Sequence, residues 1–172
     1  MSKSTFFSIV IPTLNEEVYL PKILSDLAKQ RRKNFEVIVV DAESSDKTKD
    51  KTSKFSKYFP LEFIDGKRQN VSFQRNLGVQ NASGEFLVFL DADTRVNTMF
   101  TRNLYIDIFK KKGSLYLPTL ITEERSRKNR VLFKLINSVI ELSQSFAKPL
   151  SAGGSIFIAK KLFRQLNGFK EN

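Results

Sequence analysis

The sequence predicts an α/β fold with a mostly parallel central sheet flanked by helices. Three observations support this prediction: strand-like apolar runs alternate with helical segments, the runs recur at regular spacing, and they are apolar on both faces. Strands buried on both faces are typical of parallel sheets, because the crossover helices cover both sides. A chain of 172 residues without a linker rich in Pro, Gly or Ser is expected to form a single domain, residues 1–172.

Four strands separated by three helices are expected in the first half of the chain. Asn15 is expected to cap the first helix, and Ser44 or Ser45 the second, because their side chains accept hydrogen bonds from helix amides. Gly84 is expected to end the third helix, which begins at Val71. The strands are expected where β-branched and aromatic residues gather, at 6–12, 35–41, 61–65 and 85–91.

The second half of the chain is less regular. Its longest predicted element is a helix at 125–148 with strongly basic first turns and one apolar stripe. Such a helix packs on the sheet or lies at an anionic membrane surface, and the sequence leaves both open. Pro118 indicates an edge strand, because proline donates no ladder hydrogen bond. The other predicted elements are a helix at 99–112, a strand at 115–121, and a glycine turn, strand and helix start at 151–161.

The composition excludes several kinds of active site. The chain has no Cys and no His, which rules out disulfides, thiol nucleophiles, histidine bases and imidazole metal ligands. No apolar run reaches the ~20 residues of a membrane-spanning helix and no signal peptide is visible, so a cytoplasmic protein is expected. The net charge of +11 indicates an anionic partner or a solvated lysine-rich surface, and no signature favours nucleic acid.

Aspartates stand at the ends of three predicted strands: Asp41, Asp65 and Asp91. The first strand ends in Pro12-Thr13 instead. Parallel strands have their carboxyl ends at one edge, where open α/β sheets bind ligands, so these residues are expected to meet there. Helix capping is the ordinary use of such an aspartate, and Asp65 precedes a glycine typical of a turn. Asp41 is followed by serines that can cap instead, which leaves it open to a ligand.

The sequence Asp91-Ala92-Asp93 points to a cation. If the chain stays extended there, both carboxylates lie on one side and repel each other unless a cation lies between them. Oxygen ligands suit Mn²⁺ or Mg²⁺, which commonly share them with substrate phosphates. Arg75, Arg68 and Lys67 can meet phosphate charge or remain on a solvated surface. No phosphate-binding glycine loop follows the first strand, which argues against an ATPase or a nicotinamide enzyme.

Four segments, taken in order, resemble the family 2 glycosyltransferases of the GT-A fold. They are SIVIPTLNEE, VIVVDAESSDKT, QRNLGVQNASGEFLVFLDADT and GGSIFIAKKLFRQLNGF. The resemblance covers nearly the whole chain and implies a Rossmann-like nucleotide-binding architecture. It implies a nucleotide-sugar-binding part at 1–96 and an acceptor-side part at 97–172, expected to be incomplete at its C-terminus.

The resemblance implies metal-dependent transfer of a sugar from a nucleotide diphosphate sugar, with inversion at the anomeric carbon. A UDP-sugar is favoured because the family commonly binds uracil, and a GDP-sugar stays open. Mn²⁺ or Mg²⁺ would stabilise charge on the departing diphosphate. The implied nucleotide-sugar site contains Pro12, Thr13, Glu16, Asp41 at the base, Arg75 near the base or diphosphate, and Asp91 at the ribose, with Asp93 and Asp91 at the metal.

The sequence departs from the family pattern in several substitutions and in the absence of the usual base. Ala42-Glu43 replace Asp-Gly, Gln74 stands where a small residue is common, and Asn167 replaces the first glycine of G-G-F. Inverting transfer also needs a base to deprotonate the acceptor, and the family's acidic base lies beyond G-G-F. Glu171 matches an acidic position but not the usual base. No catalytic base is therefore identified, and the chain is expected to be a fragment or to lack normal activity.

Two other functions stay open on the sequence alone. A nucleotidyltransferase is also α/β and uses a metal, but it should have a glycine-rich basic loop where this chain has LNEE at 14–17. A nucleotide-sugar-binding or membrane-surface module without full activity fits the missing base and the charge of +11. A lipid-linked acceptor is compatible with both the transferase hypothesis and the membrane-surface hypothesis. The protein would then be cytoplasmic and peripheral at the inner face of an anionic membrane.

Overall fold

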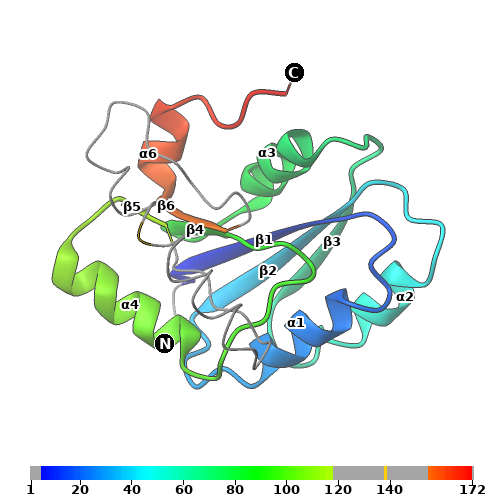
Figure 1. Ribbon diagram of the computed structural model, residues 1–172, viewed down its shortest axis with the longest axis horizontal. Coiled ribbons are helices and arrows are strands. Elements are labelled where there is room, and N and C mark those ends of the chain that lie inside the picture. The colour runs from blue at the N-terminus through cyan, green and yellow to red at the C-terminus, as the bar shows by residue number, and fades with distance from the viewer. Residues whose placement is uncertain (1–4, 118–137, 139–154, 172) are drawn as a thin grey trace.

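The computed structural model describes residues 5–117, 138 and 155–171, which form one sheet with helices on both faces (Figure 1). The predicted long helix at 125–148 and the glycine turn at 151–154 lie outside the described residues, apart from Ser138. The strands are β1 Phe7–Thr13, β2 Phe35–Asp41, β3 Leu61–Asp65, β4 Phe86–Phe89, β5 Leu115–Tyr116 and β6 Ile156–Ala159. The helices are α1 Leu20–Ala28, α2 Thr48–Ser53, α3 Val71–Asn81, α4 Phe100–Lys111 and α6 Lys160–Gln165.

The sheet has the strand order β3-β2-β1-β4-β6-β5. β1 pairs in parallel with both β2 and β4, and β2 pairs in parallel with β3. β6 runs antiparallel between β4 and β5. The α/β class and the mostly parallel sheet predicted from the sequence are confirmed. β2 and β3 lie on one side of β1, whereas β4, β6 and β5 lie on the other. The order of the strands therefore reverses between β1 and β4.

Two apolar clusters hold the helices on opposite faces of the sheet. On one face, Ile9 of β1 belongs to a cluster that includes Leu24 of α1. On the other face, its neighbour Val10 packs in a cluster with Val79 of α3 and Phe163 of α6. Figure 1 shows α1, α2 and α4 on one side and α3 and α6 on the other. Because successive side chains of a strand point to opposite faces, β1 is apolar nearly throughout.

The predicted caps of the first two helices are wrong. α1 begins after Tyr19, and α2 has no side-chain cap at its start. Asn15 instead adopts a left-handed conformation with φ 56°. Its amide donates to Ser44 Oγ at 2.7 Å, and its Oδ1 accepts from the Ser45 amide at 2.9 Å. These polar side chains satisfy each other across the loops that follow β1 and β2, so they are not available to the helices.

Gly84 has a different use from the one predicted. α3 ends at Asn81, and Gly84 lies beside the start of β1. A Cβ at this position would lie 2.7 Å from the amide nitrogen of Ser8 and 2.8 Å from the carbonyl carbon of Phe7. The glycine therefore allows two backbones to approach closely rather than ending a helix. None of the described helices is long and apolar enough to cross a membrane.

Candidate functional site

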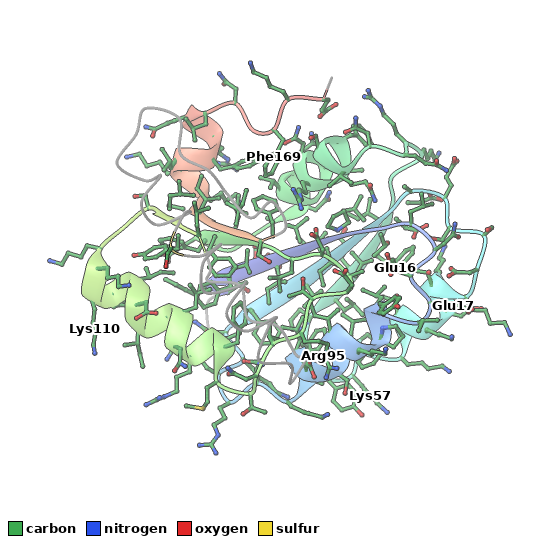
Figure 2. All side chains as sticks on the ribbon, in the orientation of Figure 1. Glu16, Glu17, Lys57, Arg95, Lys110 and Phe169 are labelled. Atoms are coloured by element: carbon green, nitrogen blue, oxygen red, sulfur yellow. The ribbon has the colours of Figure 1, made fainter. Side chains whose placement is uncertain are left out.

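The predicted site residues lie at or beside the carboxyl ends of β1, β2 and β4. This edge contains the point where the strand order reverses, which is the usual ligand position in open α/β sheets. Figure 2 shows Glu16 at the carboxyl end of β1. Pro12 and Thr13 are the last residues of β1, Glu16 lies in the following loop, Asp41 ends β2, Arg75 lies in α3, and Asp91 and Asp93 follow β4.

Asp41 connects the ends of β1 and β2. Its Oδ1 accepts hydrogen bonds from Thr13 Oγ1 at 3.0 Å and from Ser44 Oγ at 2.6 Å. Its Oδ2 accepts from the Ser44 amide at 2.8 Å. The prediction that serines would cap α2 and relieve Asp41 is therefore wrong. About three of the four acceptor positions of this buried carboxylate are occupied, and one is left for a ligand donor.

Gln74 is a buried residue whose position the sequence singled out but whose use it did not predict. Its Nε2 donates to the carbonyl of Thr13 at 2.9 Å and to the carbonyl of Val40 at 2.7 Å. These carbonyls belong to the last residue of β1 and the second-last residue of β2. The amide thus fixes α3 to the edge at which the candidate site lies. The only feature of the sequence that could indicate this role is a large polar residue at a position where the family commonly has a small one.

Arg75 and Asp91 form an ion pair between α3 and the end of β4. The distance between Arg75 Nη2 and Asp91 Oδ1 is 2.8 Å, and their side chains are 10% and 40% exposed. The guanidinium also lies 5.4 Å from the ring centre of Phe169, which Figure 2 labels near α3. Burial raises the pKa of Asp91, Arg75 opposes this shift, and Asp93 adds to it by repulsion. The Arg75 guanidinium therefore partly balances the negative charge of Asp91. Its ion pair is with Asp91 and not with Asp93.

A group of carboxylates follows β1 and β4. The pKa of Glu16 is raised by burial first, and then by repulsion from Asp93, Asp46 and Asp91. The repulsion shows that Glu16 lies within electrostatic reach of both aspartates. This all-oxygen donor set suits a hard divalent cation such as Mn²⁺ or Mg²⁺. Within the described ranges, no group of three acidic residues is arranged to hold a metal by itself.

The chain does not stay extended at Asp91-Ala92-Asp93, so the condition under which both carboxylates would lie on one side is not met. The amide of Thr94 donates to the carbonyl of Asp91 at 3.0 Å, which closes a turn over these residues. The two side chains are thus not placed by the alternation of a strand.

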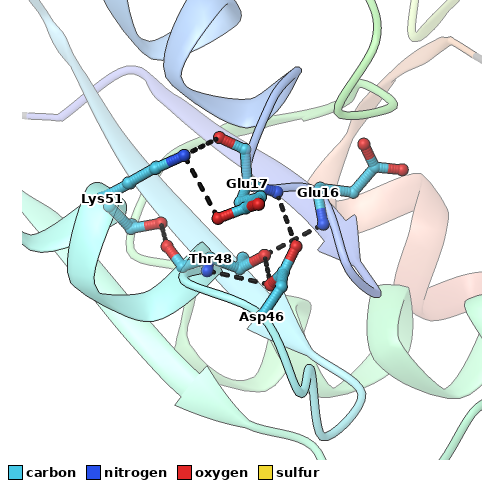
Figure 3. Close-up of polar contacts among 6 residues, drawn as sticks. Glu16, Glu17, Asp46, Thr48 and Lys51 are labelled. Atoms are coloured by element: carbon cyan, nitrogen blue, oxygen red, sulfur yellow. Dashed lines mark hydrogen bonds and ion pairs between the residues drawn. The ribbon is translucent and has the colours of Figure 1, made fainter.

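The loop that carries Glu16 is fixed by polar contacts with the start of α2 (Figure 3). The Glu16 amide donates to Thr48 Oγ1 at 2.9 Å, and the Glu17 amide donates to Asp46 Oδ2 at 3.0 Å. Lys51 pairs with the Glu17 carboxylate at 3.2 Å. Figure 3 shows the Glu16 side chain pointing away from this network. The network therefore holds the Glu16 backbone and leaves its carboxylate to face the candidate site.

The segment after Asp93 is held by a second ion pair. Arg95 Nε lies 2.6 Å from Asp26 Oδ2, and Arg95 Nη2 lies 3.0 Å from Asp26 Oδ1. Asp26 is in α1, and Figure 2 shows Arg95 beside that helix. A bidentate arginine–carboxylate pair gives geometric control as well as energy. The sequence did not predict this pair, although an aspartate next to Leu27 on the buried side of α1 is a detectable signal.

Two of the residues that depart from the family pattern share a left-handed backbone conformation. Glu43 has φ 62° and Asn167 has φ 59°, and both stand where the pattern has glycine. The backbone thus keeps a left-handed conformation although the glycine is absent. Asparagine tolerates this region well, whereas glutamate is strained there.

Glu171 is engaged in structural contacts. Its Oε1 accepts from Asn76 Nδ2 at 2.7 Å, and its Oε2 lies 3.3 Å from Arg68 Nη1. Asn76 also joins the backbone of Phe169 through both of its amide atoms. These contacts hold the end of the described chain on α3.

A comparison with protein families identifies the family of this chain. The sequence profile of glycosyl transferase family 2 matches residues 8–166. The chain belongs to glycosyl transferase family 2. The resemblance expected from the four sequence blocks is confirmed, and the chain is a member of an enzyme family.

Relatives of this family 2 chain include a larger protein of Methanococcus voltae. That protein is a dolichyl N-acetyl-alpha-D-glucosaminyl phosphate 3-beta-D-2,3-diacetamido-2,3-dideoxy-beta-D-glucuronosyltransferase. It is 30% identical over 168 residues, which cover 92% of this chain and 49% of the relative. The family 2 chain therefore spans about half the length of this relative.

Solved structures of other glycosyltransferases share the fold of this family 2 chain. Residues 1–349 of Staphylococcus aureus TarS in complex with UDP superimpose with a TM-score of 0.79 at 22% identity, and the match covers 96% of this chain and 50% of that TarS chain. A mannosyltransferase from Pyrobaculum calidifontis in complex with GDP-Man and Mn²⁺ gives a TM-score of 0.77 at 20% identity. The match covers 96% of this chain and 48% of the mannosyltransferase chain. The GT-A architecture is thereby confirmed.

Proposed function

We propose that the chain binds a nucleotide diphosphate sugar, preferentially a UDP-sugar, together with Mn²⁺ or Mg²⁺, and transfers the sugar with inversion. The observation that carries this proposal is the position of Asp91 and Asp93, which follow β4 at the edge where the strand order reverses, beside the carboxyl ends of β1 and β2. Carboxylate oxygens suit a hard divalent cation, and a cation shared with a diphosphate brings the nucleotide to the same edge.

Each residue has a distinct part in this proposal. Asp41 offers its remaining acceptor position to the base, beside Thr13 and Pro12, while Gln74 keeps the strand ends in place. Asp91 faces the ribose with its charge moderated by Arg75, and Asp93 and Asp91 would hold the metal. A bound divalent cation would stabilise negative charge on the departing diphosphate.

Solved relatives support the choice of ligand. TarS was crystallised with UDP and with UDP-GlcNAc, and the Pyrobaculum calidifontis mannosyltransferase with GDP-Man and Mn²⁺. Their low identity to this chain makes them evidence for the fold, so both nucleotides enter the test. The preference for uracil rests on the family resemblance of the Asp41 segment.

A thermal-shift experiment with Asp93→Ala tests the donor site. UDP, a UDP-sugar, GDP and a GDP-sugar are each added with Mn²⁺ or with EDTA, and the melting temperature is recorded. We expect the UDP ligands to raise it most, only with Mn²⁺, and the variant to lose the rise. Asp107→Ala is the matched control, because Asp107 is an exposed aspartate of α4. An unchanged rise in Asp93→Ala would contradict the metal role.

A second candidate is a binding module that holds the donor without full transfer. It is favoured by the contacts of Glu171 with Asn76 and Arg68, which leave no base assigned in the described chain. Labelled UDP-sugar distinguishes the two candidates: transfer to an acceptor, or slow hydrolysis by water, indicates catalysis. Donor binding without either reaction would establish the binding module.

The acceptor is proposed to be lipid-linked. One relative, from Campylobacter jejuni, is a GalNAc(5)-diNAcBac-PP-undecaprenol beta-1,3-glucosyltransferase, 36% identical over 92 residues. The proposal includes a peripheral position at an anionic membrane surface, supported by the net charge of +11. Flotation with anionic vesicles at low and high salt tests it, and no binding at low salt would contradict it.

A further inference from the structure

A cationic cavity of about 530 Å³ opens at the amino edge of the sheet. Arg31, Arg32 and Lys33, which precede β2, line it together with Arg102 of α4. The described residues that line it include no acidic side chain. β2 is seven residues long, so the cavity lies roughly 23 Å from Asp41 at the other end of the strand. This amino-edge cavity is thus separate from the candidate donor site.

The backbone that carries these cations is fixed to α4. The Arg31 amide donates to the carbonyl of Thr98 at 3.1 Å, and the Arg32 carbonyl accepts from Thr101 Oγ1 at 2.7 Å. Gln30, one residue earlier, accepts from the Thr101 amide through its Oε1 at 3.0 Å. The cations therefore project from an ordered segment on which their spacing is set before any ligand arrives.

Arg32 is the most strongly oriented of these side chains. Its guanidinium carbon lies 3.5 Å from the ring centre of Tyr105, and its Nε donates to Asn34 Oδ1 at 3.0 Å. Stacking on one face and a hydrogen bond on one edge hold the planar group in a single orientation. A preorganised guanidinium loses little conformational entropy when it binds a second anion.

Four like charges around one cavity call for an anion. Arg31, Lys33 and Arg102 are exposed and can turn toward a ligand that Arg32 has oriented. Arginines favour phosphate because their planar fork donates two parallel hydrogen bonds. α4 begins at Phe100, so the positive end of its dipole lies on the same side as Arg102. The volume suits a phosphate together with the group that carries it.

We propose that the amino-edge cavity binds a phosphate-bearing anion at a site distinct from the nucleotide-sugar site. Two sources present this chemistry: a free phosphorylated molecule and the headgroup of an anionic lipid. The site does not depend on the proposed transferase activity, because none of its residues belongs to the carboxyl edge.

The test compares two double variants with the same change of charge. Arg31→Glu with Arg102→Glu removes two cations from the cavity and keeps the stacked Arg32. Lys110→Glu with Lys111→Glu changes two exposed residues at the other end of α4, and Figure 2 labels Lys110 there. Circular dichroism melts first establish that both variants fold. All binding is measured in EDTA, so that phosphate cannot attach through a metal at the donor site.

One arm adds inorganic phosphate and records the melting temperature against chloride of equal ionic strength. The other sediments the protein with vesicles of phosphatidylcholine and phosphatidylglycerol. We expect binding in at least one arm, roughly tenfold weaker in the cavity variant and nearly unchanged in the α4 variant. A response to phosphate identifies a free ligand, and a response to vesicles alone identifies a lipid headgroup. Binding in neither arm, or equal binding by the two variants, would overturn the proposal.

Discussion

The Nη2 atom of Arg75 lies 2.8 Å from Oδ1 of Asp91, and this ion pair joins α3 to the end of β4. Arg75→Ala is expected to lower the free energy of unfolding by about 2 kcal/mol, because it removes a buried partner and leaves a half-buried carboxylate. Urea denaturation measures the change. Arg68→Ala breaks the more exposed pair with Glu171 and should cost less than about 1 kcal/mol. Equal losses would show that burial of Arg75 has no energetic role.

Gln74 bridges the carbonyls of Thr13 and Val40, and its removal should loosen the candidate site. Gln74→Leu keeps a similar volume but removes two buried hydrogen bonds, so we expect a loss of about 2 kcal/mol in unfolding free energy. Gln80→Leu, an exposed change on the same helix, is the control and should be nearly neutral. A stable Gln74→Leu protein with unchanged donor affinity would contradict the bridging role.

Glu43 adopts φ 62°, a left-handed conformation that strains residues with a Cβ. Glu43→Gly should raise the free energy of unfolding by about 0.5–1 kcal/mol, because relief of strain exceeds the added freedom of the unfolded chain. Glu43→Ala removes the same charge but keeps the Cβ, so it should not stabilise. Chemical denaturation of the three proteins separates the backbone effect from the charge effect. Equal stabilisation by alanine and glycine would point to charge alone.

Glu16 should make stability depend on pH in the absence of metal. Its folded pKa lies above the ordinary 4.5, because of burial and then repulsion from Asp93. Between 4.5 and that raised pKa the folded protein binds more protons than the unfolded chain, so stability falls as pH rises. Glu16→Gln lacks this loss. Its advantage in melting temperature over the wild type should grow as pH rises through this window and vanish below it.

The control for this titration is Glu62→Gln, which removes an exposed carboxylate from β3. Melts of this variant from acid to neutral pH in EDTA show how much of the effect comes from the loss of any one carboxylate. Mn²⁺ should reduce the advantage of Glu16→Gln if a cation relieves the repulsion. A pH-independent advantage of Glu16→Gln would refute the electrostatic explanation.

The sequence predicted the sheet and its ligand edge because these depend on local patterns. Buried parallel strands have continuous apolar runs, and their carboxyl ends must share an edge. The side-chain bridges could not be predicted in the same way. Gln74 reaches Thr13 across 61 residues of sequence, and Arg95 reaches Asp26 across 69. Such contacts depend on how helices settle on the sheet, which periodicity does not specify.

Helix ends were the least predictable elements. Asn15, Ser44 and Ser45 are common capping residues, yet here they bond one another across two loops. Local propensity identified the residue types but not their partners. Glu43 and Asn167 show the reverse situation, because the backbone shape persists although the sequence lacks the glycine that signals it.

The position of β6 sets an order of events during synthesis. β4 pairs with β6, whose residues follow it only after most of the second half of the chain. Until Ile156–Ala159 leave the ribosome, β4 exposes a row of unpaired amides and carbonyls that invites pairing with other chains. Closing such a long loop is also slow, because its entropy must be lost before the ladder forms. The nascent chain is therefore expected to need protection of the β4 edge until β6 leaves the ribosome.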